Sequence, residues 1–211
     1  MLRFEGVCKA YGDHQVLRGV SGEMAGGAFA LRGQNGIGKS TLLAVLAGAV
    51  EADGGEIWID QLPLHATPAA AQLRLAYAPD ECPVYPFMRG RELLAFVAFA
   101  KRCAVTPEVM DIVARFGLNP HLDQRCGAMS LGTQKKLMLA ATWIGTPSVV
   151  LLDEPSNGLD AKAREVLIAL LQAKSADAVS LISTHDHAFA QAIGATVIEF
   201  ESLAGAHSGR T

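Results

Sequence analysis

Apolar positions along the chain fall into two alternating kinds of run. Short continuous apolar runs are typical of buried strands in a parallel sheet, whereas apolar residues three and four positions apart indicate amphipathic helices. Runs of the first kind cover residues 28–31, 148–152, 179–182 and 196–200, and helices are expected over residues 41–47 and 163–171. This alternation of strands and helices predicts an α/β fold with a largely parallel sheet.

The amino-terminal segment has a different, two-residue period. The positions Leu2, Phe4, Gly6 and Cys8 alternate with the charged residues Arg3, Glu5 and Lys9. Such alternation predicts a strand, and we place it at the edge of a sheet. Another strand is predicted over residues 56–60, after the Asp53-Gly54-Gly55 turn.

The middle of the chain, over residues 84–143, is predicted to be mostly helical. Two apolar stripes at helical spacing are predicted to pack in the core: Leu93, Phe96, Val97 and Ala100, and then Met110, Val113 and Ala114. Gly117 is expected to end the second helix. The tail over residues 202–211 is small and polar, and we expect it to be frayed.

Composition limits the classes of protein to consider. The chain has 211 residues, of which 50% are hydrophobic and only 6% aromatic, as expected for an α/β core rich in small aliphatic side chains. The length suits one large domain or two small ones. The net charge of −3 gives no electrostatic reason to expect nucleic acid or an anionic membrane as a direct partner.

No segment predicts a membrane span or an exported protein. The longest uncharged run, residues 137–152, is interrupted by polar and turn-forming residues and is shorter than the roughly 20 residues that a spanning helix needs. It predicts a buried helix, a turn and a buried strand. No apolar signal segment follows Arg3, so we expect a cytoplasmic protein.

The cysteines give no sign of a disulfide framework or a zinc site. Cys8, Cys82, Cys103 and Cys126 are scattered and form no C-x-x-C pair. We expect them to be reduced and to serve as small apolar residues.

The most specific chemical signal is a glycine-rich loop after the first buried run. It reads Gly33, Gln34, Asn35, Gly36, Ile37, Gly38, Lys39 and Ser40, and it is followed by Thr41. This fits the phosphate-binding pattern G-x-x-x-x-G-K-[ST], in which backbone N–H groups surround phosphates, the lysine reaches the β- and γ-phosphates, and the hydroxyl binds Mg²⁺. A nucleoside triphosphate is the predicted ligand.

Two acids and a histidine follow later strands. Asp153 and Glu154 end the apolar run over residues 148–152, at the edge of a parallel sheet where ligands bind. Asp153 is predicted to lie near Mg²⁺, and Glu154 to polarise the attacking water. His185 follows another apolar run and could contact the γ-phosphate, although a lone histidine is usually structural. A metal pair with His187 is the weaker reading, because no third ligand is evident.

The segment Met129-Ser130-Leu131-Gly132-Thr133 resembles the LSGGQ signature of ABC ATPases. The expected features follow in the family's order over nearly the whole chain: Tyr11, the glycine loop, Asp80, the signature, Asp153 with Glu154, Asp160 and His185. The resemblance implies a P-loop NTPase with a RecA-like core over residues 1–80 and 144–201. It also implies an antiparallel β subdomain at the amino terminus and a helical subdomain over residues 81–143.

The resemblance also implies a mechanism. ABC domains form head-to-tail dimers that enclose two ATP molecules between the glycine loop of one subunit and the signature of the other. Tyr11 would stack on adenine, while Ser130 and Gly132 would reach the γ-phosphate of the partner's ATP. Glu154 would be the catalytic base, and Asp160 would couple the two sites.

Two departures from the family pattern bear on this mechanism. Asp80 stands where the family usually has a glutamine that touches Mg²⁺, and a carboxylate can also bind Mg²⁺. The alternative is that Asp80 is only a loop acid. Leu131 and Thr133 replace a glycine and a glutamine, but the phosphate-contacting positions Ser130 and Gly132 are kept, so ATPase activity is expected.

Several functions remain open at this level. The resemblance favours the ATPase subunit of a transporter, working with a second ATPase subunit and a separate integral membrane permease. The ATPase would lie at the inner face of the cell membrane and would contact the membrane only through that permease. Compact exporters are the better match, and the haem exporter of cytochrome c maturation and a soluble ABC ATPase are the alternatives. A small-molecule P-loop kinase leaves the signature and His185 unexplained.

Overall fold

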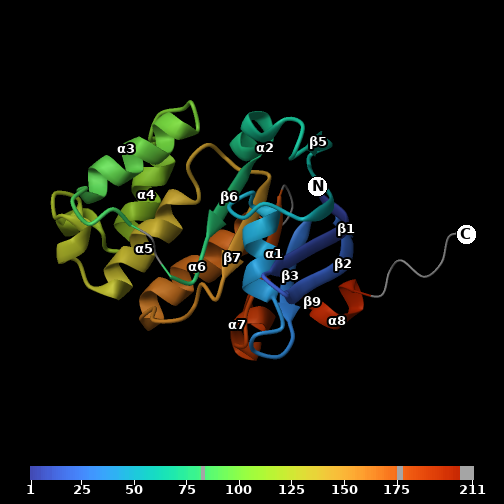
Figure 1. Cartoon of the computed structure of the whole chain (residues 1–211). Helices are drawn as coiled ribbons and strands as arrows, with labels where there is room; N and C mark the ends of the chain where they lie inside the picture. Colours follow the sequence, from blue (N-terminus) through green and yellow to red (C-terminus); the bar gives the residue numbers. More distant parts are fainter. Residues whose placement is uncertain (82–83, 175–177, 205–211) are drawn as a thin grey trace, which may run out of the picture.

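The computed structural model describes residues 1–81, 84–174 and 178–204, and it contains two sheets and a lobe of helices (Figure 1). The larger sheet has five parallel strands in the order β6-β7-β8-β3-β9. These are β3 (Gly27–Arg32), β6 (Leu75–Ala78), β7 (Val149–Asp153), β8 (Val179–Ser183) and β9 (Thr196–Glu199). The predicted parallel sheet is therefore confirmed.

The smaller sheet is antiparallel, with the order β2-β1-β4-β5. Its strands are β1 (Leu2–Tyr11), β2 (His14–Met24), β4 (Gly54–Ile59) and β5 (Leu62–Pro63). The prediction of an edge position for β1 was wrong, because β1 pairs with both β2 and β4. Alternation reports that one face of a strand is buried, and it does not report how many neighbours the strand has.

A bulge in β1 also shifts which of its residues face the core. The pairing with β2 changes register between Phe4 and Val7, and Gly6 there has a φ of 62°. A bulge adds one residue to one strand, so the side chains of the residues after it point to the opposite face of the sheet. Val7 is consequently buried, whereas Gly6 and Cys8 are only partly so.

Helix α1 (Lys39–Leu46) packs on one face of the parallel sheet, beside the antiparallel sheet (Figure 1). Its side chains share a buried cluster with Val149 and Leu151 of β7, whereas Val150 and Leu152 belong to a second cluster on the opposite face. Successive strand residues point to opposite faces, so the uninterrupted apolar run in β7 serves both clusters. Gly48, with a φ of 68°, directly follows Ala47, the C-cap of α1.

The second cluster joins the parallel sheet to five further helices. Those of the lobe are α3 (Gly90–Ala100), α4 (Pro107–Arg115) and α5 (Leu131–Ala141), and those below the sheet are α6 (Ala161–Lys174) and α7 (His187–Ala192) (Figure 1). The other elements are α2 (Pro68–Arg74), α8 (Phe200–Leu203) and two 3₁₀ turns, Asn119–His121 and Cys126–Ala128. The exact division at residues 81 and 143 stays a prediction.

The two predicted stripes lie only partly in the core, where Leu93 and Val97 of the first and Val113 of the second pack. In α3 the buried residues include Leu93, Leu94 and Ala98, whereas Phe96 and Ala100 are exposed. In α4 the core side is formed by Val109, Ile112 and Val113, with Met110 and Ala114 exposed. Apolar residues lie on both sides of each helix, so periodicity alone did not identify the face that packs.

The predictions for the uncharged run and the chain's end have mixed outcomes. Helix α5 ends at Ala141 and β7 begins at Val149, which confirms a helix, a turn and a strand. Within residues 1–81, 84–174 and 178–204, no helix is long and apolar enough to cross a membrane. The tail is helical as far as Leu203, and Phe200 starts this helix instead of ending a strand. Residues 205–211 lie outside the described part.

The described cysteines, Cys8, Cys103 and Cys126, are free, and Cys82 lies outside the described residues.

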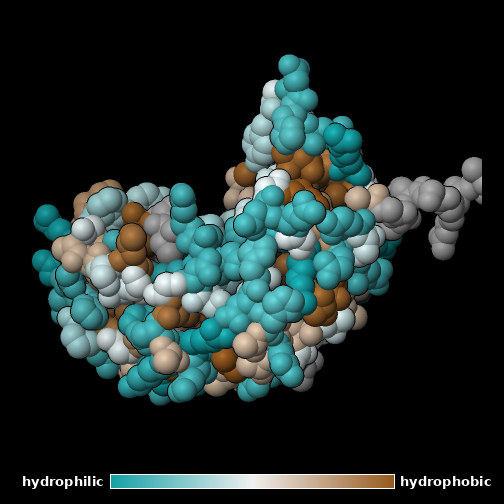
Figure 2. All heavy atoms as spheres, turned by 90° about the horizontal axis from the view of Figure 1, so that it is seen from below, coloured by the Kyte–Doolittle hydropathy of each residue, from teal (hydrophilic) through white to brown (hydrophobic). Residues whose placement is uncertain are grey.

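Figure 2 shows one face of the molecule from below, where hydrophilic side chains prevail and apolar ones form small, separate groups. The large apolar side chains of the two clusters are therefore mostly covered on this side.

Candidate functional site

A pocket of about 590 Å³ lies at the carboxyl ends of β3, β7 and β8. Eleven predicted site residues line it: Tyr11, Asn35, Gly36, Gly38, Lys39, Ser40, Thr41, Asp80, Asp153, Glu154 and His185. Its wall is completed by His14, Val16, Asn157 and Ser183, to which the sequence analysis gave no role. Segments far apart in the chain thus converge on a single cavity.

The glycine loop joins β3 directly to α1, which begins at Lys39. Gly38 has a φ of 116°, and a Cβ atom there would lie 2.8 Å from Cγ1 of Val16. Both the backbone angle and the space therefore require glycine. The positive end of the α1 dipole faces the loop, where an anion would be stabilised.

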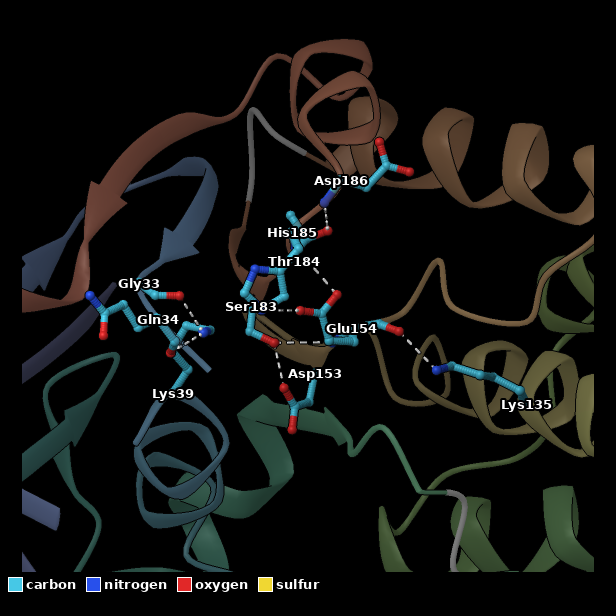
Figure 3. Close-up of polar contacts among 10 residues, drawn as sticks. All are labelled: Gly33, Gln34, Lys39, Lys135, Asp153, Glu154, Ser183, Thr184, His185 and Asp186. Carbon is cyan, nitrogen blue, oxygen red and sulfur yellow. Dashed lines mark hydrogen bonds and ion pairs between the residues drawn. The ribbon is translucent and has the colours of Figure 1, made fainter. Parts of the chain in front are cut away.

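The Lys39 side chain is buried and extends back to the first residues of the glycine loop. Its Nζ donates to the carbonyl oxygens of Gly33, at 2.7 Å, and of Gln34, at 3.0 Å (Figure 3). Gly33 and Gln34 line a neighbouring open pocket that also includes His185. Ile37 packs against the core beside α1 instead of lining either cavity.

Asp153 and Ser183 form the buried floor between two strands. Asp153 ends β7 and is only 4% exposed, and Ser183 ends the adjacent β8. The Ser183 hydroxyl donates to Oδ1 of Asp153 (Figure 3). The sequence did signal Ser183, because it is a polar residue at the end of an apolar run, as Asp153 is.

Glu154 occupies a strained turn directly after β7. Its φ is 42°, in the left-handed region that side chains other than glycine seldom adopt. Its N–H donates to the carbonyl oxygen and the hydroxyl of Ser183, each at 3.1 Å. Burial raises the pKa of the Glu154 carboxyl, while nearby His185 acts in the opposite direction. A more basic carboxylate is a better proton acceptor.

His185 faces Glu154 across the pocket (Figure 3). Its Nε2 lies 3.4 Å from Oε1 of Glu154, and its backbone N–H donates to Oε2, also at 3.4 Å. The side chain is 52% exposed, so one side of the ring remains accessible to a ligand.

Across the described ranges, no group of three or more His, Cys, Asp or Glu residues is arranged so that those side chains alone could hold a metal ion.

Tyr11 stands at the rim of the pocket, at the end of β1, and is 51% exposed. The Lys9 ammonium lies 5.7 Å from the centre of its ring. His14 and Val16 of β2 extend the same wall. These two residues were missed because the sequence analysis predicted no strand over β2.

Asp80 lies on the pocket wall, after β6, and forms an ion pair that was not foreseen. Its Oδ1 accepts from Nζ of Lys135, at 2.8 Å. Lys135 also donates to the carbonyl oxygen of Glu154, at 2.8 Å (Figure 3). No role was predicted for Lys135 from the sequence, since nothing in a linear pattern pairs it with Asp80.

Ser130, Gly132 and Asp160 do not line the pocket. Ser130 caps α5, and its Oγ accepts from the N–H of Thr133 at 3.2 Å. A Cβ at Gly132 would lie 3.2 Å from the carbonyl oxygen of Gly158. Asp160 accepts from the Ala163 N–H at 2.8 Å and pairs with Lys136 at 3.1 Å. These contacts hold the pKa of Asp160 below its usual value.

A family model described as ABC transporter matches residues 17–157. The Nod factor export ATP-binding protein I of Bradyrhizobium diazoefficiens is 34% identical over 185 residues, covering 85% of this chain and 60% of that protein. The ribose import ATP-binding protein RbsA of Bacillus licheniformis is 30% identical over 191 residues, covering 86% of this chain and 39% of that protein. The chain thus spans 60% or less of the length of these two relatives.

Solved structures match the fold. An ATP-binding subunit of an ABC transporter superposes with a TM-score of 0.84 at 26% identity, covering 94% of this chain and 85% of that chain. A dimeric ATP-binding cassette bound to ADP and Pi gives a TM-score of 0.82 at 20% identity, covering 94% of each chain. The second likeness concerns the fold alone.

The confinement of Gly38 by Val16 can be tested by measuring the free energy of unfolding. We expect Gly38→Ala to lower the free energy of unfolding by roughly 1–3 kcal/mol more than Gly194→Ala does. Both glycines have a positive φ, but a Cβ at Gly194 would meet nothing within 4 Å. Urea unfolding of both variants measures the difference, and equal losses would show that Val16 does not confine the loop.

Proposed function

Because the chain belongs to the ABC transporter family, we propose that it binds and hydrolyses ATP as the ATPase subunit of a transporter. The observation that carries this proposal is the single pocket shared by the glycine loop, Asp153, Glu154 and His185. A phosphate-binding loop and a basic carboxylate meet there, which is the arrangement that hydrolysis of a triphosphate requires.

Nucleotide binding is assigned to the loop and to the rim of the pocket. The N–H groups over residues 33–41 and the α1 dipole attract the phosphates. Lys39 supplies a buried positive charge beside them. The exposed ring of Tyr11 stands at the rim, where it can stack on adenine.

Mg²⁺ fits the oxygen donors of this pocket. Mg²⁺ is usually held by one or two protein oxygens together with substrate phosphates. The Ser40 hydroxyl and the Asp153 carboxylate line the cavity and are the proposed ligands. Asp80, which lines the same cavity and pairs with Lys135 through Oδ1, would be the third. The ion would neutralise phosphate charge.

Hydrolysis is assigned to Glu154 and His185. The Glu154 carboxylate accepts a proton from water as the water oxygen bonds to the γ-phosphorus, and the bond to the bridging oxygen breaks to leave ADP and phosphate. The raised pKa of Glu154 suits proton acceptance. His185 is close to Glu154 and to the loop, so it can hold the γ-phosphate.

The signature is proposed to act on a second subunit. Ser130 and Gly132 lie at the start of α5, outside the chain's own pocket, and the intervening Leu131 is 82% exposed. An exposed helix start can reach a phosphate held by another ATPase subunit. In such a dimer Asp160, at the start of α6, would link the two sites.

The transport direction is proposed to be export, through a separate permease. Relatives include both import and export proteins. Export is supported by the segment over residues 77–99, which resembles that of compact exporters. Within it Tyr85, Phe87 and Phe96 form an exposed aromatic cluster that a permease segment could cover. The protein would then lie in the cytoplasm, at the inner face of the membrane.

Glu154→Gln should abolish turnover and preserve ATP binding, because an amide cannot accept the proton but still fits the turn. With ATP and Mg²⁺ the variant should accumulate as a dimer on size-exclusion chromatography. If it binds ATP and remains a monomer, two copies of this chain do not pair around ATP, and the second ATPase subunit must be a different protein.

Lys39→Ala should remove most of the ATP affinity, by roughly tenfold or more, because a charged donor to the phosphates is lost. Isothermal titration calorimetry measures this directly. The control is Lys174→Met, in the last turn of α6. Unchanged affinity in Lys39→Ala would refute the role of the loop.

Asp80→Asn should raise the Mg²⁺ concentration needed for half-maximal hydrolysis, because a neutral amide binds the ion less strongly than a carboxylate does. The measurement is a Mg²⁺ titration of ATPase activity at saturating ATP. An unchanged titration midpoint would remove Asp80 from the metal ligands.

A further inference from the structure

Lys135 is a buried cation that none of the proposed roles uses. It lies in α5, five positions after Ser130, and only 7% of the residue is exposed. Burying an ammonium group is costly unless the charge is paired and its N–H groups are bonded. Here Nζ is 2.8 Å from Oδ1 of Asp80 and 2.8 Å from the carbonyl oxygen of Glu154.

The second of these contacts falls on the strained residue of the site. A non-glycine residue in the left-handed region persists only where its surroundings hold it there. The peptide groups of Glu154 are held on two sides, the N–H by Ser183 and the carbonyl oxygen by Lys135 (Figure 3). Releasing the carbonyl oxygen would let the turn relax and move the carboxylate away from His185.

The first contact anchors Lys135 itself. Asp80 follows β6, the strand that pairs with β7, so its loop adjoins the Glu154 turn. Three carboxylates, those of Asp80, Asp153 and Glu154, line the pocket. Lys135 approaches the Glu154 turn from the side away from Lys39, so the two lysines have different neighbours (Figure 3).

We propose that Lys135 is a positioning residue for ATP hydrolysis, which fixes the Glu154 turn and joins it to α5, the helix that Ser130 caps. This rests on the proposed function, because it concerns the same reaction. Lys135 does not itself line the pocket, but both of its partners, Asp80 and Glu154, do. It acts on the reaction by holding the carbonyl oxygen of Glu154. Its positive charge also offsets the negative charge of the Asp80 carboxylate at the pocket wall.

The test is Lys135→Met, which keeps an unbranched side chain of similar size and removes the ammonium group. The expected result is a fall in kcat of about tenfold or more, with KM and calorimetric ATP affinity changed by less than about threefold. This split follows because Lys39, and not Lys135, is bonded to the glycine loop. Lys135→Arg retains charge and donors and should recover most of the lost kcat.

Lys174→Met is the matched control. Lys174 ends α6 near the start of β8, at the edge of the sheet opposite the pocket, and its replacement should leave kcat and KM unchanged. If the unmodified protein does not hydrolyse ATP, the proposed function fails. If it does, and Lys135→Met retains kcat within about threefold or loses ATP affinity in proportion, the positioning role is overturned.

Thermal unfolding shows whether each variant is folded. Should Lys135→Met not fold, the comparison is between Lys135→Arg and Lys135→Gln, since glutamine can donate to a carbonyl but has no charge to pair with Asp80. The expected result is a lower kcat for Lys135→Gln at an unchanged KM. Equal kcat values in these two variants would contradict the proposal.

Discussion

The turn at Glu154 is the constraint on which the site depends. The carboxylate proposed to accept a proton from the attacking water stands in a left-handed backbone conformation, immediately after a fully buried strand. Its orientation is set by three neighbours from separate elements: Ser183 at the end of β8, His185 just beyond it, and Lys135 from α5. Strain of this kind persists only where the surrounding structure holds it in place.

The rest of the fold supplies those neighbours. The parallel strands β7 and β8 bury both of their faces, one against α1 and the antiparallel sheet and the other against the helical lobe. Their carboxyl ends are therefore fixed from both sides. The same packing brings Asp80, in the loop after β6, close enough to Lys135 to form an ion pair. A helix of the lobe is thereby tied directly to the edge of the sheet that carries the pocket.

Local chemistry made much of this predictable from the sequence. The spacing of the glycine loop, the apolar runs that end in acids and the position of His185 each depend on near neighbours in the chain, and they identified the pocket. The predicted edge position of β1 was wrong and the predicted core faces of α3 and α4 were only partly right, because these features depend on which elements pack together. Ser183 was within reach of the same reasoning, whereas Lys135 was not: its partners, Asp80 and the Glu154 carbonyl, are 55 and 19 residues away.

The central claim is that this turn is held ready for a nucleotide bound by the glycine loop. Its most direct measurement is a crystal structure with Mg²⁺ and an ATP analogue that is not hydrolysed. We expect the γ-phosphate within hydrogen-bonding distance of Lys39, with Lys135 still bonded to the carbonyl oxygen of Glu154 and the carboxylate facing the phosphate. A bound nucleotide with Lys135 detached and Glu154 turned away from the γ-phosphate would contradict it.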